Sequence, residues 1–92
     1  MIGRVEISER AQRQLRKVPK HIGVKLLAWA KAVRDTSLEE LRKVPGYHDE
    51  PLKGGRTGQR SIRLSSAYRA IYVIKKDTAE FVSVEEVHKH DY

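Results

Sequence analysis

Two histidines and a tyrosine near the carboxyl end of the chain are the residue types best suited to moving protons. His88, His90 and Tyr92 alternate, so in an extended conformation their side chains project to one side. Imidazole can accept or donate a proton at neutral pH. Two other interpretations are a His-x-His metal chelate, with His21 and His48 as distant further ligands, and a frayed polar tail.

A lysine lies in the segment Pro51-Leu52-Lys53-Gly54, where a loop is expected to enter a sheet. The glycines that follow Lys53 let the backbone approach a phosphate closely. The segment is not a Walker loop, because no Gly-Lys-Ser/Thr follows. The pattern indicates a phosphate contact rather than a nucleotide triphosphate site.

Two arginines are expected to lie close together on neighbouring strands. Arg63 points away from the face used by its apolar neighbours, and Arg69 opens the next strand across a tight turn. Two guanidinium groups there can hold a phosphate by bidentate hydrogen bonds. The alternative for Arg69 is an ion pair with Glu85 or Glu86 on the neighbouring strand.

A lysine, two arginines, a histidine and a tyrosine are together what metal-independent RNA cleavage requires. A base removes the proton of the ribose 2′-hydroxyl, which attacks its own phosphate, and an acid protonates the departing 5′-oxygen. Cationic donors stabilise the charge of the transition state. DNA lacks this nucleophile, so the chemistry would be confined to RNA, with Lys53, Arg63, Arg69, one of the terminal histidines (His88 or His90) and Tyr92 as catalytic candidates and no metal or other cofactor.

Composition and charge agree with a nucleic-acid partner. The 92 residues allow one domain, residues 1–92, and the formal net charge is +7. The stretch from Leu52 to Lys76 holds seven Lys or Arg and no acidic residue, whereas twelve basic and twelve acidic residues cancel in the remainder. A polyanion is the expected partner of such a stretch, and a solvated face is the alternative. The chain has no cysteine, signal peptide or membrane span, which favours the cytoplasm.

Hydrophobic periodicity predicts an α+β fold. We expect a strand at 2–7, a helix capped by Ser8, a second helix from 20 to 35, and a short third helix opened by Ser37 and running through Val44. The second helix has Ile22, Leu26, Trp29 and Val33 on one face. The second half alternates with period two and predicts strands at 60–65, 68–74 and 81–87. The order is β-α-α-(short α)-β-β-β, a helical hairpin packed on one face of a mainly antiparallel sheet.

The ordered combination of these segments resembles the RelE/ParE superfamily of bacterial toxins, and within it the HigB and YoeB branch. The resemblance lies in residues 51–54, in Gly58-x-x-Ser61-Ile62-Arg63, in 65–72 and in the His/Tyr terminus. It implies the RelE-like microbial ribonuclease fold and a toxin of a type II toxin–antitoxin system. Such a toxin is an endoribonuclease (mRNA interferase) that cleaves mRNA in the A site of the 70S ribosome, inhibits translation and arrests growth.

Position by position, the resemblance assigns the loop lysine to Lys53 and the strand arginines to Arg63 and Arg69. His90 matches the basic or proton-transferring position near the terminus, and Tyr92 the terminal aromatic residue. Asp91 separates that pair, whereas HigB and YoeB endings place Tyr and His adjacent, so the roles of the histidines stay interchangeable. Further RNA-binding candidates are Arg56, Arg60, His48, His88 and Tyr68, of which Tyr68 or the terminal tyrosine could stack on an mRNA base.

The resemblance also implies a cognate antitoxin, which we expect to be acidic, partly disordered and DNA-binding, with the complex regulating its own operon. Two other functions stay open. A ParE-like toxin shares the fold but inhibits DNA gyrase and needs no proton-transfer groups. A non-catalytic RNA-binding module would use the basic residues alone.

Overall fold

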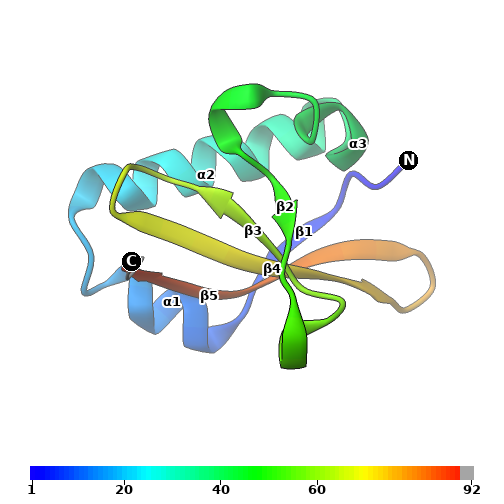
Figure 1. The fold of residues 1–92 in the computed structure, drawn as a ribbon. Helices are drawn as coiled ribbons and strands as arrows, with labels where there is room; N and C mark the ends of the chain where they lie inside the picture. The colour runs from blue at the N-terminus through cyan, green and yellow to red at the C-terminus, as the bar shows by residue number, and fades with distance from the viewer. Residues whose placement is uncertain (90–92) are drawn as a thin grey trace.

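The computed structural model describes residues 1–89 and places three helices against a five-stranded sheet (Figure 1). The helices are α1 (Glu9–Leu15), α2 (Lys20–Asp35) and α3 (Leu38–Leu41). The strands are β1 (Val5–Ile7), β2 (Glu50–Pro51), β3 (Arg60–Arg63), β4 (Tyr68–Lys76) and β5 (Glu80–Lys89). Two short 3-10 turns, η1 (Pro45–Tyr47) and η2 (Gly54–Arg56), flank β2.

The strand order in the sheet is β1-β5-β4-β3-β2. β1 is parallel to β5, and the other neighbouring pairs are antiparallel. The predicted α+β architecture with a mainly antiparallel sheet is therefore confirmed. The sequence did not predict β2, because two residues that include a proline show no alternation.

Side-chain caps explain where the first and third helices begin. The Ser8 hydroxyl accepts a hydrogen bond from the amide of Ala11 at 3.0 Å, and the Ser37 hydroxyl accepts one from the amide of Glu40 at 3.2 Å. The third helix ends at Leu41 rather than at Val44 as predicted. Val44 is extended, with φ −81° and ψ 110°. The reason is that the proline that follows it disfavours the helical conformation.

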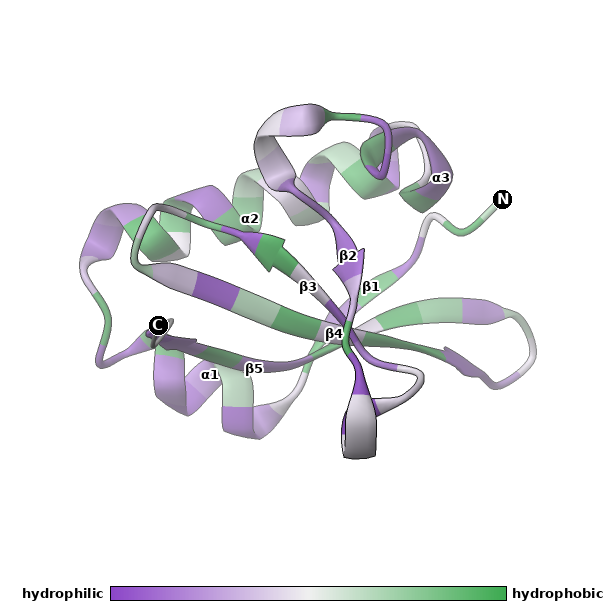
Figure 2. Cartoon of the chain, viewed as in Figure 1, coloured by the Kyte–Doolittle hydropathy of each residue, from purple (hydrophilic) through white to green (hydrophobic). Residues whose placement is uncertain are grey.

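The core lies between α2 and one face of the sheet. Ile22, Leu26, Trp29 and Val33 are fully buried, which confirms the predicted apolar stripe of α2. Hydrophobic and hydrophilic residues alternate along this helix (Figure 2). The Trp29 and Tyr72 rings pack with their centroids 5.5 Å apart. No helix of the described residues is long and apolar enough to cross a membrane.

Candidate functional site

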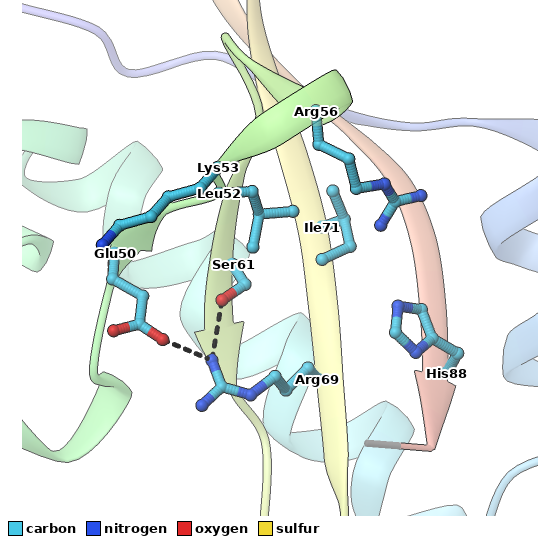
Figure 3. A pocket seen from close by; sticks show the side chains of 8 residues that line it. All are labelled: Glu50, Leu52, Lys53, Arg56, Ser61, Arg69, Ile71 and His88. Atoms are coloured by element: carbon cyan, nitrogen blue, oxygen red, sulfur yellow. Dashed lines mark hydrogen bonds and ion pairs between the residues drawn. The ribbon is translucent and has the colours of Figure 1, made fainter. Parts of the chain in front are cut away.

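A pocket lies on the sheet face opposite the core, where β2 and η2 cross the end of the sheet (Figure 3). Its volume is about 190 Å³, comparable to about six water molecules. The lining side chains are Glu50, Leu52, Lys53, Arg56, Ser61, Arg69, Ile71 and His88. Three permanent cations face one carboxylate and one imidazole, so the pocket suits an anion.

The strand register explains why these side chains meet. Residues directly opposite each other in an antiparallel pair share one face. Arg63 pairs with Arg69 across β3 and β4, and Arg69 pairs with His88 across β4 and β5. A second row, from β2 to β5, holds Glu50, Ser61, Ile71 and Glu86.

An irregularity in β5 turns His88 toward this face. The pairing partner of Ile71 is Glu86, but the partner of Tyr72 is Val84, so β5 holds one extra residue there. The alternation changes phase across this bulge: Val84 and Val87 are both buried in the core although three positions separate them. If side chains alternated regularly from Val84 onward, His88 would fall on the core face.

Helix α1 satisfies the free edge of β5 beside the bulge. The amide of Val87 donates to the Gln14 side-chain oxygen at 2.6 Å, and the Ser8 hydroxyl donates to the carbonyl of Glu85 at 3.1 Å. β1 pairs only with residues 82–84, so these side chains continue the hydrogen bonding where β1 ends. The strand that carries His88 is thereby fixed from both sides.

Arg69 is the most enclosed cation of the pocket, with 11% of its side chain exposed. Its Nη1 donates to the Ser61 hydroxyl at 2.7 Å and to the Glu50 carboxylate at 3.3 Å. Figure 3 shows both bonds converging on the guanidinium. The suggested ion pair with Glu85 or Glu86 is wrong, since the acidic partner comes from the short β2 instead. The other carboxylate oxygen of Glu50 lies 3.3 Å from Nε2 of His48.

A buried network on the other face fixes the chain just before Glu50. The Asp49 carboxylate, with 1% of its side chain exposed, accepts hydrogen bonds from Nε of Arg60 at 2.7 Å and from the Tyr72 hydroxyl at 2.6 Å. Burial raises the pKa of Tyr72 to about 12, and the bond to Asp49 acts in the same direction. Tyr72 therefore stays a donor at neutral pH, and β2 is held in place.

The pocket brings together some of the residues that the sequence singled out. Lys53, Arg56, Arg69 and His88 all line it. Arg63 lies on the same face but outside the described pocket lining, one strand from Arg69.

Three other candidates lie outside the pocket, and two lie outside the described residues. Arg60 lies toward the core face and is paired with Asp49, and the Tyr68 ring packs against the hydrophobic core rather than facing the pocket. His48 is paired with Glu50 and lines a neighbouring cavity. His90 and Tyr92 lie outside the described residues.

Sequence reasoning missed Glu50 and Ser61 as pocket residues. Glu50 directly precedes Pro51-Leu52-Lys53, so the segment that identified Lys53 also contained it. Ser61 occurs in the Ser61-Ile62-Arg63 run, but only the register of β3 against β4 shows that it lies beside Arg69.

In the folded chain, acidic residues from elsewhere form ion pairs with several of the basic residues between Leu52 and Lys76. Arg56 pairs with Glu86 at 2.7 Å, and Lys75 lies 3.7 Å from Glu85. Together with the pairs of Arg60 and Arg69, four of the seven cations have an acidic partner. The local excess of charge is thus smaller than the sequence alone indicated.

Solved structures are similar in fold over nearly the whole chain. The toxin–antitoxin complex RelBE2 from Mycobacterium tuberculosis contains a chain with 28% identity and a TM-score of 0.70, covering 98% of this chain and 100% of that chain. The chain therefore has the fold of the RelE/ParE toxin superfamily.

Other solved members of the superfamily are similar in fold. YafQ from E. coli strain BL21(DE3) has 17% identity and a TM-score of 0.72, covering 94% of this chain and 91% of that chain. The YoeB/ParE toxin from Agrobacterium tumefaciens has 16% identity and a TM-score of 0.69, covering 96% and 99%. No family model matches the sequence, and no curated protein does. These structures come from several branches of the superfamily, so membership of the HigB and YoeB branch stays a prediction.

Proposed function

We propose that this chain is the toxin of a type II toxin–antitoxin pair and that it cleaves mRNA in the A site of the 70S ribosome without a metal. The observation that carries the proposal is the pocket itself. Lys53, Arg56 and Arg69 surround a space that Glu50 and His88 border from opposite ends. Three cations suit a phosphate, and two groups able to exchange protons suit a reaction at it.

The proposed reaction begins at the ribose 2′-hydroxyl. Glu50 accepts its proton, the 2′-oxygen bonds to the adjacent phosphorus, and the bond from phosphorus to the 5′-oxygen breaks. His88 gives a proton to that 5′-oxygen. The products are a 2′,3′-cyclic phosphate and a 5′-hydroxyl, and the cations stabilise the charge on the phosphoryl oxygens. His90 and Tyr92 stay candidates for the proton steps from outside the described residues.

The positions of Glu50 and His88 support this division of roles. Glu50 is on β2 and His88 is on β5, with β3 and β4 between them, so three interstrand spacings, roughly 14 Å, separate the two strands. Both side chains point into the pocket, on either side of Arg69 (Figure 3). A base and an acid on opposite sides of the phosphate match an in-line attack, in which the entering and leaving oxygens face away from each other.

Dependence on the ribosome and on an antitoxin follows from charge. A net charge of +7 favours contacts with ribosomal RNA and makes them strongly salt-dependent. The same positive charge suits an acidic, partly disordered and DNA-binding antitoxin. The complex of this antitoxin with the toxin would regulate the operon. RelBE2 from Mycobacterium tuberculosis was solved as a toxin–antitoxin complex, and the archaeal RelE from Pyrococcus horikoshii OT3 was solved as a complex with RelB.

Primer extension on a reporter mRNA after brief induction tests the proposal, beside a plasmid-supercoiling assay on the same cells. New 5′ ends within translated codons, lost when translation is blocked, are expected. Intact mRNA with inhibited supercoiling would assign the chain to the gyrase-inhibiting ParE class. Intact mRNA with normal supercoiling, together with retained RNA binding, would leave a non-catalytic RNA-binding module.

A further inference from the structure

Glu86 is a nearly buried carboxylate beside the pocket that the proposed reaction does not use. Its side chain is 10% exposed, and its sheet partner on β4 is the pocket residue Ile71. Two arginines contact it: Nη2 of Arg56 at 2.7 Å and Nη2 of Arg10 at 3.6 Å. A carboxylate removed from water is stable only when cations or donors surround it, and these two arginines supply the cations here.

Hydrogen bonds within the turn and across its base are the other described interactions that hold the segment carrying Arg56. Residues 53–58 are all exposed, and Gly54 and Gly58 adopt positive φ values of 69° and 93°. The hydrogen bonds of Thr57 go to Gly54 within the turn itself. The ion pair of Arg56 with Glu86 joins this turn to β5, and Arg10 extends the link to α1.

We propose that Glu86 is a positioning residue that holds Arg56 over the pocket, ready for the scissile phosphate; this rests on the proposed function. The guanidinium has five N–H donors, and the bond to Glu86 uses only Nη2. The remaining donors are free to bind a phosphoryl oxygen while the carboxylate fixes the plane of the group. Fixing a long side chain before the substrate arrives removes part of the entropic cost of binding it.

The bulge in β5 makes this contact possible. It turns Glu86 to the open face although Val84 and Val87 on either side are in the core. The same irregularity therefore orients both His88 and the carboxylate that holds Arg56.

The first test is Glu86→Gln, which keeps the shape and removes the charge. We expect RNA cleavage to fall about 10- to 100-fold while the midpoint of thermal unfolding shows that the protein still folds. Glu85→Gln is the matched control, because Glu85 is the adjacent residue, is paired with Lys75 and does not line the pocket; cleavage by this variant should match wild type.

A double-mutant cycle separates positioning from a general structural effect. In an Arg56→Ala background, Glu86→Gln should change cleavage less than about twofold, because the residue that it acts on is gone. Equal losses in both backgrounds would show that Glu86 does not act through Arg56 and would overturn the inference.

A measurement independent of cleavage uses the Nη2–H signal of Arg56 in ¹⁵N NMR spectra. Wild type should show a slowly exchanging signal that Glu86→Gln loses, and the affinity for inorganic phosphate should fall in parallel. If wild type cleaves no RNA in any assay, the proposed function fails, and these two readouts still judge the positioning. An Arg56 signal and a phosphate affinity that Glu86→Gln leaves unchanged would overturn the positioning alone.

Discussion

Arg69 and Glu50 are ion-paired at 3.3 Å inside the pocket, although 19 residues separate them in the chain. The carboxylate occupies one donor of a guanidinium that the proposed reaction directs at a phosphate. Nearly half of the Glu50 side chain is exposed, so it can shift when RNA enters at little cost. In the proposed reaction Arg69 binds the phosphate, whereas Glu50 accepts a proton and adds a negative charge to the pocket. Substituting the two residues should therefore affect binding and cleavage differently.

Arg69→Ala should abolish growth inhibition and lower cleavage by about 10²-fold or more, because the most enclosed cation of the pocket is removed. The free energy of unfolding should fall by only about 1 kcal/mol, since Glu50 can be hydrated and only the Ser61 hydroxyl loses a donor. Arg69→Lys keeps the positive charge but lacks the paired N–H donors of the guanidinium, so its cleavage rate should lie between those of wild type and Arg69→Ala. Urea denaturation beside the cleavage assay checks both parts, and an unfolded Ala variant would assign Arg69 a structural role.

Glu50→Gln should move cleavage and binding in opposite directions. Cleavage should fall about 10²-fold or more, because the proposed base is gone. Affinity for an RNA with a 2′-deoxy residue at the scissile position, which cannot be cut, should rise because a negative charge leaves the pocket. Single-turnover kinetics measures the cleavage rate, and fluorescence anisotropy measures the affinity for the uncleavable RNA. Loss of both together would mean that Glu50 serves only to hold Arg69.

His88→Gln and His90→Gln distinguish the two histidines near the terminus. The pocket contains His88, so its variant should lose about 10²-fold or more in cleavage. The sequence pattern assigns the same role to His90, and its Gln variant tests that assignment directly. If only the second variant is impaired, His88 acts as an RNA contact; if neither is, no terminal histidine transfers a proton.

Tyr72 should titrate at a higher pH than an ordinary tyrosine. Its folded pKa of about 12 exceeds the ordinary value of 10.0 because burial disfavours the phenolate. Its contribution to stability is therefore complete below pH 10 and is lost as the pH rises toward 12. Phenolate absorbance during a pH titration should show a late step that is absent in Tyr72→Phe. The absence of a phenolate step above pH 10 would contradict this packing.

The sequence by itself determined where helices begin and which face of β3 carries Arg63. Ser8 and Ser37 predicted two helix starts, and the apolar stripe predicted α2 from Lys20 to Asp35. The alternation around Arg63 correctly placed it on the solvent face of β3. These features depend on residues within a few positions of each other, and local patterns therefore carry them.

The tertiary structure alone decided which charged groups meet. The acidic partners of Arg56 and Arg69 are Glu86 and Glu50, each from another strand, and the short β2 that carries Glu50 has no pattern of its own. The bulge that turns His88 toward the pocket appears in the strand pairing and in the burial of both Val84 and Val87. Register and pairing depend on which strands lie side by side, and long-range packing sets that order.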